Sequence, residues 1–236
     1  MLRKALADIS IPKQHISEDS RQYAYRVIKN HIISFTLLPG QKLNEQAFAS
    51  ALHVSRTPVH DSFSRLSREK LVEIIPQRGA FVSRLDEVHI RNALWTHSIL
   101  GVNALHSIFI KNVGKNNLEV LCESLHKAKD CLEHDVLTAL SSAICHYYSQ
   151  LYALAGDMNL IWDALERTDG DLQRLLTLSV SNPQSAQALL SDLSAITVSL
   201  QQRDCDAACH RYEKHLGRLS EAVCSFKQLY PDYFTV

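Results

Sequence analysis

Four side chains between residues 57 and 68 carry hydrogen-bonding groups at helical spacing. Thr57, His60, Ser64 and Arg68 recur at steps of three and four in VSRTPVHDSFSRLSR, which places them on one side of an α-helix. Arg56 stands at the mouth of the same helix. Because a guanidinium, an imidazole and hydroxyls donate and accept hydrogen bonds, this face is suited to contact a polar or anionic partner.

The other side of this helix is apolar and therefore suited to packing. Ser55 or Thr57 can accept amide hydrogens that a helix start leaves free, and Pro58 falls in the first turn, where its missing N–H removes no hydrogen bond. The sequence thus predicts a helix with one reading face and one packing face. The packing face comprises Val59, Phe63 and Leu66.

Three further elements are predicted around this helix. Residues 21–35 carry an apolar stripe at steps of three and four, which predicts a helix that stops before LLPG. Asn44 is a suitable N-cap for the short helix NEQAFASAL. LVEII and AFVSR flank PQRG, which predicts a β-hairpin with Arg78 and Gly79 at its tip. Helix, turn, helix and hairpin predict a winged helix-turn-helix.

The rest of the chain is predicted to be mainly α-helical, and its charge differs from that of the front. Residues 1–84 hold 13 basic and 7 acidic residues, whereas residues 85–236 hold 12 and 18. We therefore expect an anionic partner to meet a winged helix-turn-helix domain at 1–84, which includes an N-terminal arm at 1–19. Residues 85–236 are expected to form an all-α bundle of about six helices. These helices are expected near 86–111, 116–133, 136–156, 159–178, 184–202 and 204–228.

At LPGQKLNEQAFASALHVSRTPVHDSFSRLSREKLVEIIPQRGAFV the chain resembles the GntR family of bacterial transcription regulators. PG, L-x-E, VSRTPV and the RGAFV wing occur in the family's order and spacing, from about Tyr25 to Val82. The helical remainder resembles the effector domain called FCD, found in the FadR-type branch. The resemblance implies a homodimer that places two recognition helices in successive major grooves of a palindromic DNA operator, with each wing near a minor groove.

The resemblance assigns DNA-contacting roles to the recognition helix. Arg56 falls where the family has an arginine that contacts DNA, and Thr57 and Ser64 lie on the same reading face. The family pattern V-R-E-A-L reads VHDSF here, so His60 replaces a second arginine, and base preference at that step should differ. Gln46 stands where many relatives carry a basic residue and can read adenine or remain in solvent.

Four further residues are expected at the DNA through the same resemblance. Arg78 and Gly79 match the wing tip, where glycine permits close approach of the backbone and a cation favours the minor groove. Lys42 and Arg26 are expected to contact phosphates rather than bases, with solvation alone as the alternative.

Many FCD domains hold a divalent metal with an aspartate and three histidines. The positions that match this set here are Ser142, His146, Leu193 and His215. Because only two ligands remain, we expect no cofactor and no tightly bound metal, with His146 and His215 as a fallback pair. Cys145 and Asp192 each lie one position off the required face.

The resemblance also places a small-molecule pocket in the helical bundle. A family arginine and glutamate are replaced by His97 and Gly101. Small residues follow one face of the helix near 136–156, which leaves space for a ligand if that face points inward; the alternative is that it faces solvent. We expect His97, His146, His215 and Ser142 to bind a small anionic or hydroxylated metabolite. The small-residue face comprises Ala139, Ser142, His146 and Ala153.

Two other functions compete with metabolite-controlled DNA binding. Cys145, Cys205 or Cys209 could sense oxidants, although reduced, buried thiols are the simpler expectation. An enzyme built on the twelve histidines is disfavoured, because the sequence has no nucleophile elbow, phosphate-binding glycine loop or HExxH motif. We therefore predict a DNA-binding regulator, expected to be a repressor, and not an enzyme.

The remaining expectations concern compartment and assembly. The N-terminal MLRKALADISIPKQ has no long apolar segment, and no run of about 18 apolar residues occurs. A cytoplasmic protein with no membrane partner is therefore expected. Dimerisation is expected to use the helical domain, because one recognition helix gives too little interface for tight specific binding.

Overall fold

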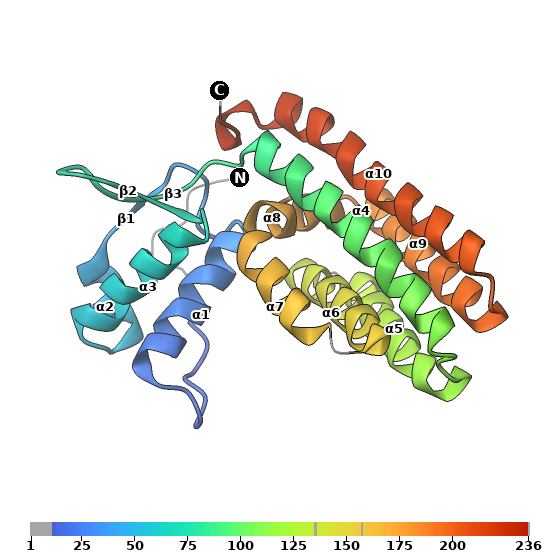
Figure 1. Ribbon diagram of the computed structural model, residues 1–236. Coiled ribbons are helices and arrows are strands. Elements are labelled where there is room, and N and C mark those ends of the chain that lie inside the picture. Colours follow the sequence, from blue (N-terminus) through green and yellow to red (C-terminus); the bar gives the residue numbers. More distant parts are fainter. Residues whose placement is uncertain (1–10, 135, 157, 236) are drawn as a thin grey trace. The chain divides into compact units, whose positions relative to one another are not determined.

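The computed structural model describes residues 11–134, 136–156 and 158–235, which divide into two compact units. The first unit runs to Glu87 and also contains the C-terminal segment from Tyr230, and the second is Val88–Leu229. Figure 1 shows a small sheet with three helices in the first unit and a set of helices, the longest of them α4 and α10, in the second. The predicted fold class, a winged helix-turn-helix followed by a helical bundle, is confirmed. Of the predicted N-terminal arm, residues 1–10 lie outside the described residues.

The first unit is built from three helices and one antiparallel sheet. Its elements are α1 (Ser20–Ile33), β1 (Lys42–Leu43), α2 (Glu45–Leu52), α3 (Arg56–Arg68), β2 (Val72–Ile75) and β3 (Gly79–Val82). The strand order is β1-β3-β2, and β2 and β3 are the predicted hairpin. β1 was not predicted, because two residues are too few to show an alternating pattern. It pairs Leu43 with Ala80 and so attaches the start of α2 to the hairpin.

Local capping explains where these helices begin. Asp19 forms a capping box with Gln22 at the start of α1. The side chain of Asn44 accepts the Ala47 amide at 3.0 Å, which confirms the predicted cap of α2. Ser55 occupies the N-cap of α3, but contrary to expectation its side chain makes no capping hydrogen bond. The buried residues that hold the three helices and the sheet together include Ile28, Ile32, Phe48, Leu52, Val59, Phe63, Leu66, Leu71 and Val82.

The C-terminal segment belongs to the first unit, which differs from the expected boundary at residue 84. Leu85 donates its amide to the Tyr233 carbonyl at 2.8 Å, and Thr235 donates to the Leu85 carbonyl at 2.9 Å. Phe234 is buried, and the Tyr233 ring stacks on Phe35 with centroids 5.7 Å apart. The segment is too short to carry a periodic pattern, so its packing against distant residues could not be read from the sequence.

The second unit consists of α-helices with one short 3-10 turn at Lys115–Leu118 within the described residues. The helices are α4 (Glu87–Ile110), α5 (Glu119–Glu133), α6 (Leu137–Ala155), α7 (Asn159–Thr168), α8 (Gly170–Val180), α9 (Pro183–Gln202) and α10 (Cys205–Leu229). The helix predicted near 159–178 is therefore two helices. They are separated at Asp169, whose ψ of 17° departs from helical geometry. The Asp169 carboxylate at this break contacts His97 of α4.

Helix α4 has the length and composition of a membrane-spanning segment, with one third of its most apolar window buried. Such helices also occur in the cores of soluble proteins, so this property alone is weak evidence for a membrane. One face of α4 is buried, from Ile90 to Ile108. A second face exposes Val88, Trp95 and Ile99, which raises the mean hydropathy of the helix.

Candidate functional site

The predicted reading face of α3 is exposed. Arg56, Thr57 and His60 are exposed and Ser64 is half-buried, whereas the opposite residues of the packing face are almost fully buried. Pro58 lies in the first turn of α3, as predicted. The helix therefore presents a cation, a hydroxyl and an imidazole to solvent from a rigid support.

Glu45, the first residue of α2, contacts two residues of this face. Its Oε1 lies 2.9 Å from Nδ1 of His60, and its Oε2 lies 3.8 Å from Nη2 of Arg56. The carboxylate thus holds the imidazole and offsets the guanidinium charge. No role was assigned to Glu45 from the sequence, although it is the acidic residue of the L-x-E motif. Gln46, the next residue, is exposed as expected for a contact residue.

The wing carries the second group of cations. Arg78 and Gly79 are exposed at the hairpin tip, and Gly79 has a φ of 105° that disfavours any other residue. A Cβ placed on Gly79 would lie 3.4 Å from Cε of Lys42. Pairing of β1 with β3 therefore brings the exposed Lys42 beside the wing tip, although it lies far from Arg78 in sequence.

The Arg26 guanidinium already donates hydrogen bonds to protein acceptors, which the phosphate-contact hypothesis did not include. Its Nε and Nη2 donate to the two carboxylate oxygens of Glu18 at 2.7 and 2.8 Å, and Nη2 also donates to the Lys13 carbonyl. The hydrogen bond from Arg26 lowers the pKa of Glu18 to about 2. Arg26 thus ties the segment before α1 to that helix, and a phosphate contact would have to compete with this pair.

A largely buried polar network fixes α3 against α1. The Tyr25 hydroxyl donates to Glu69 at 2.7 Å, Lys29 donates to Glu69 at 2.9 Å, and Arg65 donates to the same carboxylate at 3.3 Å. The Arg65 guanidinium lies 3.6 Å from the centroid of the Tyr25 ring. These contacts set the orientation of α3 and therefore of its reading face.

Beside this network, α1 and α3 border an open groove of about 380 Å³. Arg21, Arg65 and Arg68 line it, and Arg21 forms an ion pair with Asp61 at 3.1 Å. Arg21 received no role from the sequence, because a single arginine in the first turn of a helix carries no distinctive pattern. The groove adds positive charge beside the reading face.

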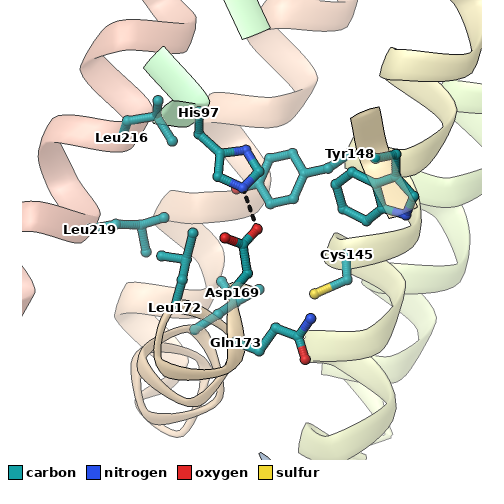
Figure 2. Close-up of a pocket in the computed structure, with 10 residues that line it drawn as sticks. His97, Cys145, Tyr148, Asp169, Leu172, Gln173, Leu216 and Leu219 are labelled. Carbon is teal, nitrogen blue, oxygen red and sulfur yellow. Dashed lines mark hydrogen bonds and ion pairs between the residues drawn. The ribbon is translucent and has the colours of Figure 1, made fainter. Parts of the chain in front are cut away.

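In the second unit, a small cavity lies against a buried histidine–aspartate pair. His97 of α4 and Asp169 are both buried, with Nε2 and Oδ2 2.6 Å apart (Figure 2). The Trp162 ring lies 6.4 Å from that of His97. The cavity encloses about 20 Å³, room for about one water molecule. Its other lining residues are Cys145, Tyr148, Trp162, Leu172, Gln173, Leu176, Leu216 and Leu219.

His215 is fully buried and does not line the cavity itself, but it contacts Tyr148, which does. Its Nε2 lies 2.5 Å from the Tyr148 hydroxyl, and its Nδ1 lies 3.5 Å from Asp192. Burial raises the pKa of Tyr148 well above its ordinary value, so this hydroxyl stays protonated. Asp192, which the sequence placed one position off the required face, thus lies beside His215, and Arg218 donates a hydrogen bond to its carboxylate at 2.8 Å.

Ser142 and His146 are exposed, so the structure does not bring them to His97 or His215. The small-residue face of α6 points outward, which was the alternative left open by the sequence. The reason is that α6 buries Tyr148 and Tyr152 beside its leucine stripe, and this widened buried face leaves 142 and 146 on the outer side. The two members of the fallback metal pair differ in their environment, because His146 is exposed and His215 is fully buried.

Gly101 is required by its neighbour. A Cβ on Gly101 would lie 2.3–2.4 Å from atoms of the Tyr212 ring. Tyr212 therefore fills the space beside α4 at Gly101, one turn along the helix from His97.

Comparison with known proteins agrees with the winged helix-turn-helix. Residues 21–82 match the family described as bacterial regulatory proteins, gntR family. The chain is 26% identical over 214 residues to the HTH-type transcriptional repressor RspR of Escherichia coli strain K12, which covers 91% of this chain and 93% of that relative.

Two solved structures share the fold. A putative transcriptional regulator GntR from Rhodococcus sp. RHA1 has a TM-score of 0.74 at 20% identity, covering 87% of this chain and 97% of that chain. McbR/YncC of E. coli also has a TM-score of 0.74, at 16% identity, covering 90% and 99%. Residues 21–82, which match the family, also contain the exposed face of α3 and the wing. The chain is therefore a DNA-binding transcription regulator of the GntR type, with its DNA-binding domain in these residues.

Proposed function

We propose that the chain is a repressor of the FadR-type branch, that it binds a palindromic operator as a homodimer, and that a small metabolite in its FCD-like second unit changes its affinity for DNA. The observation that carries DNA reading is the exposed polar face of α3 beside the cationic wing. The name of the relative RspR, a repressor, supports the sign of regulation.

In this proposal α3 lies in the major groove and each exposed residue has a distinct role. Arg56 donates two parallel hydrogen bonds to a guanine edge or clamps a phosphate, and Thr57 contacts a neighbouring base or phosphate. His60 reads a base with the imidazole nitrogen that does not face Glu45. Ser64 is half-buried in the middle of α3, and it contacts the sugar–phosphate backbone of the DNA.

The wing and the start of α2 supply the remaining contacts. Arg78 enters the minor groove, Gly79 allows close approach of the backbone, and Lys42 neutralises a nearby phosphate. Gln46 reaches an adenine edge or a phosphate from the first turn of α2. We assign Arg26 to positioning the segment before α1, because its pair with Glu18 occupies the guanidinium.

The proposed effector site is the cavity at His97 and Asp169. A hydroxyl or carboxylate of a small metabolite can replace part of this pair's hydrogen bonding while the leucine side chains cover its apolar portion. Because the cavity admits about one water molecule, a metabolite must displace a wall residue such as Trp162 or Gln173. His215 acts indirectly, through Tyr148, and no cofactor is proposed.

The proposed dimer interface is the exposed apolar face of α4. Val88, Trp95, Ile99 and Ile110 are exposed by 51%, 68%, 43% and 84%, and their spacing places them on one side of the helix. An exposed apolar face on a regulator that must present two recognition helices favours a second copy of the chain as its cover.

A variant of this face tests the assembly. Trp95→Asp is expected to convert a dimer to a monomer in light scattering and to weaken operator binding roughly tenfold or more, because a buried tryptophan is a typical interface hot spot. Val198→Asp, on α9 and 42% exposed, is the matched control and should stay dimeric. A Trp95→Asp dimer of wild-type stability would contradict this interface.

The function as a whole is tested by selecting bound sequences from random duplex DNA. The proposal expects a palindromic consensus whose half-sites are separated by about one helical turn. An enriched pool with no dyad symmetry, or no enrichment at all, would overturn it. DNA binding of this kind also implies a cytoplasmic location in a bacterial cell.

A further inference from the structure

A group of side chains of the kinds that ligate metal ions lies outside the cavity and the DNA-binding domain. His106 is near the end of α4, Cys205 is the first residue of α10, and Cys209 follows one turn later. Sγ of Cys205 lies 3.3 Å from Nδ1 of His106, and Sγ of Cys209 lies 3.9 Å from Nε2. One ligand atom from each residue can be chosen so that all lie within 4.8 Å of one another.

We propose that His106, Cys205 and Cys209 form a binding site for a thiophilic transition-metal ion, with Zn²⁺ as the best fit. Two thiolates and one imidazole are the donors that zinc prefers, and they do not suit Mg²⁺ or Ca²⁺. Zinc–ligand bonds of about 2.0–2.3 Å place tetrahedral ligands about 3.3–3.8 Å apart. The side chains therefore need only small movements to surround an ion.

The spacing on α10 supports this geometry. Residues four apart lie on the same side of a helix, so the sulfurs of Cys205 and Cys209 both face α4. Cys205 also lies at the amino end of α10, where the helix dipole favours a thiolate. The exposed His106 leaves solvent access to the group, so a water molecule can complete the tetrahedron.

Two thiolates balance the charge of a divalent ion, because metal binding displaces both thiol protons.

The surrounding turn holds the ligands in place before any ion binds. The Asp204 carboxylate accepts the Ala207 amide at 2.9 Å at the start of α10. Arg203 donates a hydrogen bond to Asn112, which follows the end of α4. An ion at this point would join the carboxyl end of α4 to the amino end of α10 and stabilise the unit. This inference does not depend on the proposed effector or operator.

Cobalt substitution tests the site in the full-length protein. Reduced protein titrated with Co²⁺ without oxygen is expected to bind one ion per chain and to show sulfur-to-cobalt charge-transfer bands with visible bands of tetrahedral Co²⁺; Zn²⁺ should abolish them. Cys205→Ser, Cys209→Ser and His106→Gln should each weaken binding roughly tenfold or more. Cys224→Ser, an exposed cysteine on the same helix, is the matched control and should bind as wild type does.

A second measurement uses the wild-type chain and so does not depend on variants that fold. Zn²⁺ should protect Cys205 and Cys209 from alkylation, as mapped by mass spectrometry, and leave Cys224 equally reactive. Absence of cobalt–thiolate bands in fully reduced protein would overturn the proposal, whether or not the two cysteines form a disulfide in air. Equal loss of binding in Cys224→Ser, or equal protection of Cys224, would also overturn it.

Discussion

The Glu45 carboxylate and the His60 imidazole, 2.9 Å apart, connect the first residue of α2 to the reading face of α3. The contact engages one ring nitrogen of His60, and the proposed complex uses the other nitrogen for DNA. It also places a negative charge 3.8 Å from Arg56, where it opposes phosphate attraction. In the proposed complex, Glu45 lowers the affinity for DNA of any sequence and orients the residues that read sequence.

Substitution at His60 should change which sequence is read. His60→Arg adds a permanent charge and a forked donor, so the selected consensus should gain guanine at one position of each half-site, with about 1–3 kcal/mol of discrimination. Glu45→Gln should strengthen binding to scrambled DNA and reduce the difference in affinity between the operator and scrambled DNA. Both are measured by competition binding at several salt concentrations. If His60→Arg selected an unchanged consensus, His60 would not be a residue that reads the DNA sequence.

Metabolite binding should depend on His97 and not on His146. A compound that raises the thermal midpoint of wild type should lose its effect in His97→Ala, because His97 lines the cavity and pairs with Asp169. His146→Ala is the matched control, since His146 is exposed on the outer side of α6. Thermal-shift screening measures both, and a shift that survives in His97→Ala would place the effector site elsewhere.

Two glycines should respond to the same substitution with opposite signs. Gly101→Ala should destabilise the chain by about 1–3 kcal/mol, because the new methyl group overlaps the Tyr212 ring. Gly217→Ala in α10, where no atom lies within 4 Å of the new Cβ, should stabilise by about 0.5–1 kcal/mol through helix propensity. Urea unfolding measures both. Equal effects would show that Tyr212 does not fill the space beside Gly101.

The DNA-binding domain could be predicted from sequence because its signals are local. The apolar stripe of α3, Pro58 in its first turn and the glycine of the hairpin each specify their own geometry within a few residues. Pairing of Lys42 with the wing and of Glu45 with His60 depends on contacts between distant segments, so neither could be read from spacing.

The helical unit was harder to predict from the sequence because its helices bury polar rings. Tyr148 and His215 are buried, whereas His146, which has the same hydrogen-bonding groups as His215, is exposed. Amphipathic spacing located the leucine stripe of α6 but not the tyrosines beside it, since tyrosine and histidine occur on either face. The break at Asp169 was missed, and the pairing of Asp169 with His97, 72 residues away, could not be read from local spacing.

Lowering the pH should destabilise the second unit, because it protonates Asp192. Burial raises the pKa of this carboxyl, but the neighbouring His215 and the hydrogen bonds from Arg218 outweigh burial and lower the pKa from 3.8 to about 2. The ionised group therefore stabilises the fold above pH 3.8, and this stability is lost as the pH falls toward about 2. Asp192→Asn should flatten the fall of the urea midpoint in that range, whereas Asp163→Asn, on the exposed side of α7, should not. A parallel fall in wild type and Asp192→Asn would contradict the assignment.

The most direct test of DNA reading by α3 is the binding of wild type and Arg56→Ala to a duplex carrying the chain's own promoter, titrated against salt. Wild type should prefer this duplex to a scrambled one. Arg56→Ala should bind both at the scrambled level, with a salt slope smaller by about one if Arg56 clamps phosphate. A wild-type protein that ignores its promoter at low salt with and without ligand, or an Arg56→Ala variant that binds as wild type does, would contradict the placement of α3 in the groove.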